Sequence, residues 1–251
     1  MSLLVIFLAG IAAGAINSIA GGGTLISFPA LLWIGRDPIV ANATNTVAIW
    51  PGSLAGAFGF RRELATARRW LLLLIVPSIA GGALGAWLLL RTPSEIFERI
   101  VPFLILGATI LLAMQEMVTK RLGLVAKSHE NPGAGWMIFV VVFQLLVGIY
   151  GGYFGAGMGI LMLAALGLIG MVDMHQMNGV KNVLAVFING IAAIYFALAS
   201  AVAWGDVLVM MIGTIIGGYA GARMARKLGR TFVRRAVVVI GIVMAVALFL
   251  K

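Results

Sequence analysis

The sequence predicts an all-α membrane protein that crosses the bilayer several times and is built from two similar halves. Hydrophobic residues fill 62% of the 251 positions, and charged residues fill only 10%. A soluble fold could not bury that much apolar surface, so the chain is expected to lie in a lipid bilayer. The two halves are predicted by a second observation: the first part of the sequence recurs, with changes, about 136 residues further along.

The recurrence involves glycines and polar residues. Gly14 precedes a glycine cluster at 21–23, and Gly148 precedes a second cluster at 155–159. The further matches are Asp37 with Asp173, Thr44-Asn45 with Lys181-Asn182, and Gly81-Gly82 with Gly217-Gly218. Glycine occupies 33 positions, so glycine matches alone could arise by chance, and the polar matches favour duplication. We therefore expect a first repeat at 1–118, a cytoplasmic linker at 119–134 and a second repeat at 135–251.

Each repeat is expected to contain a broken or re-entrant first hairpin followed by three spans. Crossing the hydrocarbon core takes roughly 20 apolar residues at roughly 1.5 Å each. Segments of about this length lie at 3–20, 39–60, 70–90, 100–117, 136–154, 176–202, 207–222 and 235–250. Shorter pieces at 24–34 and 157–171 follow the two glycine clusters. The prediction is about eight full spans and two short half-helices.

The two glycine clusters interrupt apolar segments and are expected to break the helices there. Irregular backbone at membrane depth is tolerated where protein buries it or where it lines a wet cavity. The half-helix after each break would present its positive N-terminal end to that cavity, which is a favourable arrangement for an anion. Other glycines repeat every four residues and are expected at close helix crossings; these are Gly81, Gly85, Gly217 and Gly221.

The distribution of basic residues predicts the orientation. The formal net charge is +10, and the basic residues gather in three short stretches: the loop 61–69, the linker, and 223–235. The positive-inside bias makes all three cytoplasmic, so this charge is not a sign of nucleic-acid binding. If the linker and 223–235 lie on the same side of the membrane, an even number of crossings separates them. Residues 136–171 must then enter the membrane and return to the same side, which inverts one half relative to the other. The alternative count, with four spans per half and a parallel repeat, leaves one basic loop on the outer face.

Lys181 is the one basic residue placed well inside a predicted span. A lysine near the bilayer centre costs roughly 2.5–3.5 kcal/mol on insertion scales, so it should face a cavity, a partner or a bound anion. The alternative is a structural role, in which Lys181 snorkels or pairs with Asp173 or Glu116.

These motifs, taken in order, resemble the TauE/SafE family of sulfite and organosulfonate exporters. The runs that carry the resemblance are Gly21–Ile26, Asn42–Asn45, Pro51–Gly56, Phe60–Arg62, Gly155–Gly159, Lys181-Asn182 and Ile188–Gly190. The resemblance covers nearly the whole chain. It implies a permease for small sulfur- or carbon-based anions, embedded in the bacterial cytoplasmic membrane with about eight spans.

The expected function is secondary transport of small anions by alternating access, with sulfite, organosulfonates or related carboxylates as substrates. An anion channel and a membrane-embedded enzyme remain as alternatives. Enzymatic chemistry has little support, because the only histidines, His129 and His175, lie near loops and no carboxylate cluster appears. No catalytic residue, metal or cofactor is therefore expected. Expected partners are the anion, the lipid bilayer and a coupling ion, H⁺ or Na⁺; the oligomeric state is left open.

The expected substrate site combines the glycine breaks with the polar residues of the spans that follow them. Its members are Gly21, Gly22, Gly23, Thr24, Thr44, Asn45, Gly155, Gly157, Gly159, Lys181, Asn182 and Asn189.

Overall fold

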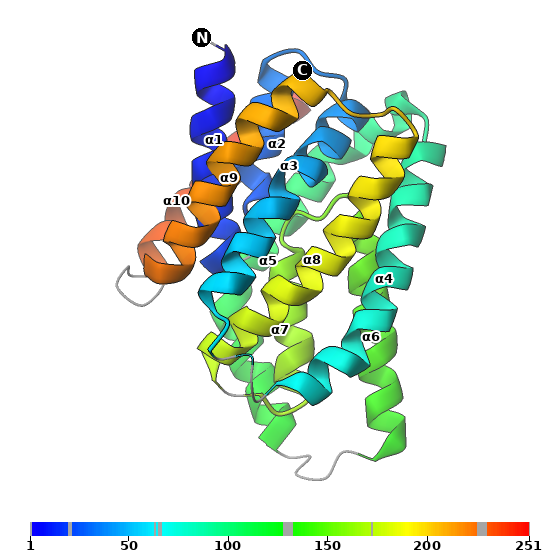
Figure 1. Cartoon of the computed structure of the whole chain (residues 1–251), viewed down its shortest axis with the longest axis vertical. Coiled ribbons are helices and arrows are strands. Elements are labelled where there is room, and N and C mark those ends of the chain that lie inside the picture. Colours follow the sequence, from blue (N-terminus) through cyan, green and yellow to red (C-terminus); the bar gives the residue numbers. More distant parts are fainter. Residues whose placement is uncertain are drawn as a thin grey trace.

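The computed structural model describes residues 2–19, 22–62, 64, 67–127, 133–171, 173–224 and 230–250. This part of the chain is all-helical, with ten helices and no strand (Figure 1). The first five helices are α1 (Ser2–Ile19), α2 (Thr24–Trp33), α3 (Pro38–Gly59), α4 (Arg68–Arg91) and α5 (Ser94–Lys127). The second five are α6 (Ala134–Tyr153), α7 (Met158–Leu168), α8 (Met174–Leu198), α9 (Trp204–Met224) and α10 (Arg230–Phe249). Each predicted segment corresponds to one helix, and α5 continues into the stretch expected to be the linker.

The helices make the chain a multi-pass membrane protein. Within the described residues, five segments are long and apolar enough to cross a membrane: α4, Ser94–Met114 of α5, α6, α8 and Trp204–Gly221 of α9. Helix α3 is not among them, because its polar residues and Pro51 interrupt the apolar sequence. The half-helices α2 and α7 have 10 and 11 residues. At roughly 1.5 Å per residue, each spans about half of the hydrocarbon core.

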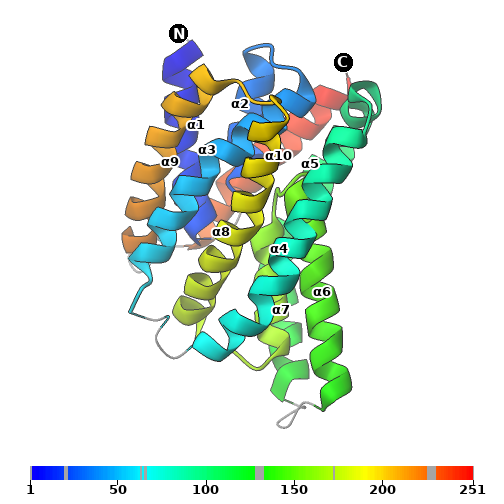
Figure 2. The ribbon, with the colours of Figure 1, turned by 45° about the vertical axis from the view of Figure 1, so that its right-hand side comes forward.

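The first helices of the two halves begin at opposite ends of the molecule. Both termini lie at the upper end of Figure 1, which we call the terminal end. Helix α1 runs away from the terminal end, whereas α6 runs towards it, and Figure 2 shows the same relation from another side. Helices α3 and α8 are likewise antiparallel to each other. The C-terminal ends of α3 and α5 and the N-terminal ends of α4 and α6 lie at the opposite end, which we call the linker end.

Helices pack mainly across the two halves. Helix α1 packs along α9 and α6 packs along α4, while α3 contacts α8 and α9, and α8 contacts α3 and α4. Helices α5 and α10 contact each other. These pairs correspond when α1–α5 are matched in order with α6–α10, so each half completes the other in the same way. The exchanged packing makes the bundle one folding unit.

Glycines permit the closest of these contacts. A Cβ added to Gly85 would collide with the backbone carbonyl of Ile149 in α6, and one added to Gly217 would collide with that of Ile11 in α1. Gly81 and Gly221 lie equally close to the backbones of α6 and α1. The prediction that these four glycines lie at close helix crossings is confirmed.

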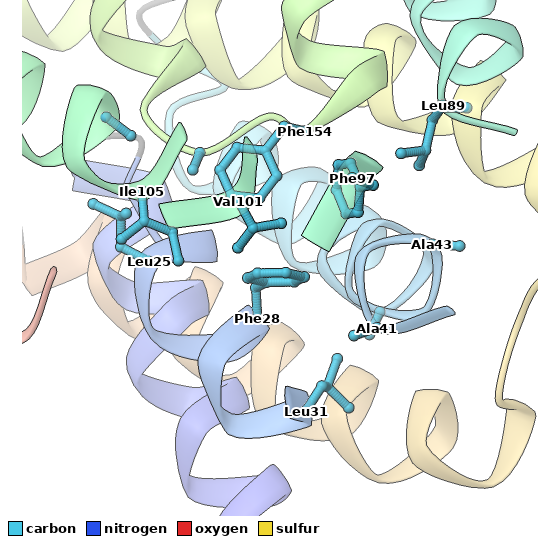
Figure 3. Close-up of a cluster of buried hydrophobic side chains, with 14 of the residues drawn as sticks. Leu25, Phe28, Leu31, Ala41, Ala43, Leu89, Phe97, Val101, Ile105 and Phe154 are labelled. Atoms are coloured by element: carbon cyan, nitrogen blue, oxygen red, sulfur yellow. The ribbon is translucent and has the colours of Figure 1, made fainter. Parts of the chain in front are cut away.

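Aromatic packing holds the half-helix α2 against the second break. The rings of Phe28 in α2 and Phe154 after α6 meet edge to face, with centroids 5.3 Å apart. Phe97 of α5 also packs on Phe154, with ring centroids 6.3 Å apart. Figure 3 shows these rings with Val101 in one buried cluster. A short helix with few backbone hydrogen bonds is thereby fixed by tertiary packing.

The two longer helices that follow the half-helices begin with the same cap. Asp37 accepts hydrogen bonds from the backbone N–H groups of Ile39 and Val40, and Asp173 accepts from those of His175 and Gln176. An N-cap carboxylate satisfies amides that have no partner within the helix and interacts favourably with the helix dipole. The predicted match of Asp37 with Asp173 is therefore a match of structural role.

Candidate functional site

A small polar cavity lies where the two broken segments meet. Its volume open to the centre of a water-sized molecule is about 10 Å³, which is room for about one water molecule. Five polar side chains line it together with four other residues: Asn17, Thr24, Asn45, Thr46 and Asn189, and Ile49, Phe154, Gly155 and Met158. Thr24 and Met158 are the first residues of α2 and α7. The N-terminal ends of both half-helices therefore reach the same cavity.

The first break is shaped by close packing. Gly23 is the N-cap of α2 and has ordinary right-handed backbone angles, φ −58° and ψ −36°. A Cβ on Gly23 would collide with the backbone carbonyl of Ala13 in α1, so only glycine fits there. A Cβ on Gly22 would make ordinary contact with the Leu112 side chain at 3.4 Å. Gly21, the remaining predicted glycine of this cluster, lies outside the described residues.

The second break is shaped by backbone handedness. Gly155 and Gly157 have φ angles of +77° and +74°, in the left-handed region that favours glycine. The backbone N–H groups of Phe154 and Gly155 both donate to the carbonyl of Tyr150 at the end of α6. The Tyr150 hydroxyl donates to the Ala156 carbonyl at 2.6 Å. The turn between α6 and α7 is thus fixed by backbone conformation and by one tyrosine.

Two buried asparagines, one of which lines the cavity, have side-chain atoms without a hydrogen-bond partner. Asn45 is 1% exposed, and its amide nitrogen donates to the Thr24 hydroxyl at 3.4 Å while its side-chain oxygen has no hydrogen-bond partner. Asn182 is equally buried, and neither polar atom of its side chain has a partner. Buried polar groups are normally paired, so the unpaired Asn45 oxygen at the cavity is suited to a polar ligand.

Lys181 is buried at the first break and contacts the end of α1. Its ammonium group donates to the backbone carbonyls of Asn17 and Ser18, at 2.9 and 3.1 Å. Helix C-termini carry partial negative charge, so a buried cation is stabilised there. Lys181 does not itself line the cavity, whereas Asn17 does. Asp173, one of the alternative partners considered above, caps α8, and the side chain of Glu116 lies outside the described residues.

The structure brings together only some of the residues predicted for the site. Thr24, Asn45, Gly155 and Asn189 line the cavity, and Lys181 contacts the backbone beside it. Thr44 faces away, since its hydroxyl accepts from the backbone N–H of Ala203. Gly157 packs on Ala108 of α5, and Gly159 is buried within α7. The expected site did not include the cavity residues Asn17 and Thr46. Both are polar residues within apolar segments, and this polarity was the signal that could have added them.

The contacts also revise the alignment of the repeats. A Cβ on Gly82 would lie 2.8 Å from the Ile188 carbonyl, and one on Gly218 would collide with the Gly52 carbonyl. Positions 82 and 218, like 52 and 188, are 136 apart in sequence. The same offset pairs Lys181 with Asn45, so the sequence-based pairing of Lys181 with Thr44 is wrong by one residue. The error arose because Asn45, which follows Thr44, was aligned with the identical residue Asn182, which follows Lys181.

A helical membrane protein with paired broken segments around a buried polar cavity has the architecture of a membrane transport protein. The chain belongs to the TauE/SafE family, described as sulfite exporter TauE/SafE, whose model matches residues 6–248. It is 31% identical over 243 residues to a probable membrane transporter protein of Haemophilus influenzae, covering 96% of this chain and 92% of that one. It is 27% identical over 244 residues to the probable membrane transporter protein YfcA of Escherichia coli, covering 97% and 88%.

A third relative, a probable membrane transporter protein of a Sinorhizobium species, is 28% identical over 249 residues, covering 98% of this chain and 92% of that one. No solved structure matches the chain. The family and the relatives' names support a membrane transporter and leave the substrate, its direction and its coupling to be determined.

Proposed function

We propose that this protein is a secondary transporter that moves a small anion across the bacterial cytoplasmic membrane by alternating access. The observation that carries the proposal is the convergence of Thr24 and Met158 on one cavity. These residues begin α2 and α7, so two positive helix ends point at the same buried place. A buried site of this kind favours a negative ligand.

The surrounding side chains suit an oxyanion. Asn17 and Asn45 each donate one amide hydrogen within the protein, to Ser53 and Thr24, so the second amide hydrogen of each can donate to an oxygen atom of a ligand. The positive charge of Lys181 lies on the backbone carbonyl of Asn17, behind the cavity wall. We propose sulfite, organosulfonates or related carboxylates as substrates, in line with the description of the family. The cavity holds about one water, so the helices must separate before a substrate can enter. This state is therefore interpreted as a closed form between the two accessible ones.

The alternating-access mechanism follows from an inverted repeat, which is also part of the proposal. Its support is the opposite direction of α1 and α6 and the exchanged packing of the two halves. Arg62 and Arg68 lie by the connection from α3 to α4 at the linker end, and Arg223 lies in the last turn of α9. The positive-inside bias then makes the linker end cytoplasmic and leaves both termini outside.

Topology can be tested directly because the chain contains no cysteine. Single cysteines at the exposed positions Arg62 and Arg223 should resist an impermeant thiol reagent in intact cells. Cysteines at the exposed positions Glu95 and Trp204 should react. Reaction of cysteines 62 and 223 from opposite faces would exclude the inverted repeat.

Transport is tested with purified protein in liposomes. We expect saturable uptake of sulfite or a sulfonate, with counterflow of labelled substrate when unlabelled substrate is trapped inside. Sulfate and small carboxylates complete the panel. Flux that does not saturate and lacks counterflow would favour the anion channel, and conversion of an anion by detergent-solubilised protein would favour an enzyme.

A further inference from the structure

An ion pair joins the two halves at the terminal end. Arg36 lies in the corner between α2 and α3, and Asp206 lies in the first turn of α9. The Arg36 guanidinium makes two hydrogen bonds to the Asp206 carboxylate, at 2.6 and 3.2 Å. This two-point geometry is stronger and more specific than a single contact between point charges. It is the only ion pair found within the described residues.

The two partners differ in exposure. The Asp206 side chain is 6% exposed, whereas that of Arg36 is 44% exposed. Asp206, through its hydrogen bond and its charge, raises the pKa of the Arg36 guanidinium above its ordinary value, so Arg36 remains charged at any physiological pH. If the pair separated, the Arg36 guanidinium would return to water. The buried Asp206 carboxylate would be solvated only if the structure opened there and admitted water. The pair can therefore hold a closed state and still be broken when that region opens.

Two further contacts join α3 to the N-terminal part of α9 near the ion pair. The backbone N–H of Ala203 donates to the Thr44 hydroxyl at 3.0 Å. Val47, Ala193 and Val207 form an apolar cluster between α3, α8 and α9. Thr44 and Val47 flank Asn45 and Thr46, which line the cavity. The ion pair, the hydrogen bond and the apolar cluster thus all join α3 or the corner before it to α9 or the residues just before it, next to residues that line the cavity.

The linker end is built differently. The repeat-related position of Asp206 is 70, at the revised offset of 136 residues, and it is occupied by a tryptophan. Trp70 packs with the buried apolar cluster that contains Met171 and Met177. The corresponding position to Arg36 is a valine in the sequence. The charged pair at the terminal end therefore has apolar residues at its repeat-related positions in the sequence.

We propose that Arg36 and Asp206 form the gate at the terminal end, closed in this structure and broken whenever the cavity opens to that side. They act as positioning residues, since they hold α2–α3 against α9 and do not line the cavity. The flux measurements rest on the proposed transport function, but the accessibility measurements do not.

Cross-linking tests whether the pair must separate. In the cysteine-free chain, the variant with Arg36→Cys and Asp206→Cys is treated with a short bifunctional thiol reagent whose bonds dithiothreitol reverses. Flux in liposomes should be lost on cross-linking and recovered on reduction. The reagent should not lower the flux of either single-cysteine variant below that of the same variant without treatment. Full flux through the cross-linked protein would overturn the proposal.

Charge replacement tests the gate without substrate. A reporter cysteine is placed in the cavity by Thr46→Cys, and its reaction with a small impermeant reagent is followed from the terminal side. Asp206→Asn should raise the reaction rate about tenfold, because a partly buried, two-point charge pair is lost. Exchanging the charges, Arg36→Asp with Asp206→Arg, should lower the rate again towards that of the reporter alone.

Glu95→Gln is the matched control, since it removes one exposed carboxylate near the same end and should leave the reporter rate unchanged. A reporter rate unmoved by Asp206→Asn would mean that the pair is only structural. If Asp206→Asn does not yield folded protein, the cross-linking result decides alone. A reporter that responds as expected in a protein that transports none of the tested anions would support the gate and refute the proposed function.

Discussion

The two glycine breaks occupy equivalent places in the two halves, yet the backbone passes through them in different ways. At the first break, Gly23 has right-handed angles and is required because α1 passes against it. At the second, Gly155 and Gly157 have positive φ angles and are required for their conformation. A glycine cluster of the same appearance therefore has two physical causes, and substitutions should separate them.

The polar residues beside the breaks differ as well. Lys181 places its ammonium group on the carbonyls that end α1, whereas the repeat-related residue, Asn45, presents an uncharged amide to the cavity. The surroundings of the two half-helices therefore differ in charge, although the two half-helices converge on one cavity.

Among the variants that test this comparison, Gly23→Ala should have the largest effect on stability and flux. Its Cβ would collide with the Ala13 carbonyl, a backbone atom that cannot turn aside, and overpacking of this kind costs about 3 kcal/mol. We expect a large loss of thermal stability in detergent and no flux. Gly22→Ala is the matched control, because its Cβ would meet only a leucine side chain at 3.4 Å. Equal behaviour of the two variants would show that close packing does not define the first break.

Lys181→Met should come next, because it removes a buried charge and keeps most of the stem. Losing the two charge-assisted hydrogen bonds to the end of α1 should lower stability by about 1.5–3 kcal/mol. Losing the positive charge behind Asn17 should weaken apparent affinity for an anion by roughly one order of magnitude, or about 1.4 kcal/mol. Lys181→Arg should retain part of the affinity. The measurement is thermal stabilisation by added sulfite or sulfonate. If Lys181→Met lowers the unfolding temperature but leaves the affinity unchanged, Lys181 serves only to hold the end of α1.

Lys181 also shows how far the sequence could be interpreted. Its position in an apolar span correctly predicted a buried cation with a partner, but that partner is the backbone of α1, more than 160 residues away. Every residue has a backbone carbonyl, so no sequence pattern could indicate which carbonyls Lys181 would contact. The ten helices were predictable because apolar length and glycine breaks are local signals. The cavity was not, because it depends on which face of α3 and α8 turns inward.

The second break should respond to handedness. Gly157→Ala places a side chain on a residue with φ +74° and should cost about 1–2 kcal/mol. Gly170→Ala is the matched control: its φ is +85°, and no atom lies within 4 Å of the added Cβ. Both variants should lose similar stability in thermal unfolding, but only Gly157→Ala should lose flux. A similar flux in both would mean that the turn before α7 tolerates change and that the site does not depend on it.

The smallest expected effect concerns the two buried asparagines. Asn45 lines the cavity and hydrogen-bonds Thr24, so Asn45→Ala should lose a neutral hydrogen bond of about 1 kcal/mol and weaken apparent affinity about fivefold. Asn182 makes no side-chain hydrogen bond and does not line the cavity, so Asn182→Ala should change affinity less. Removing its unpaired amide also relieves a desolvation cost, so its unfolding temperature should stay constant or rise. Substrate titrations followed by thermal unfolding measure both quantities. A larger loss of affinity in Asn182→Ala than in Asn45→Ala would move the binding site from this cavity to the surroundings of Asn182 and Lys181.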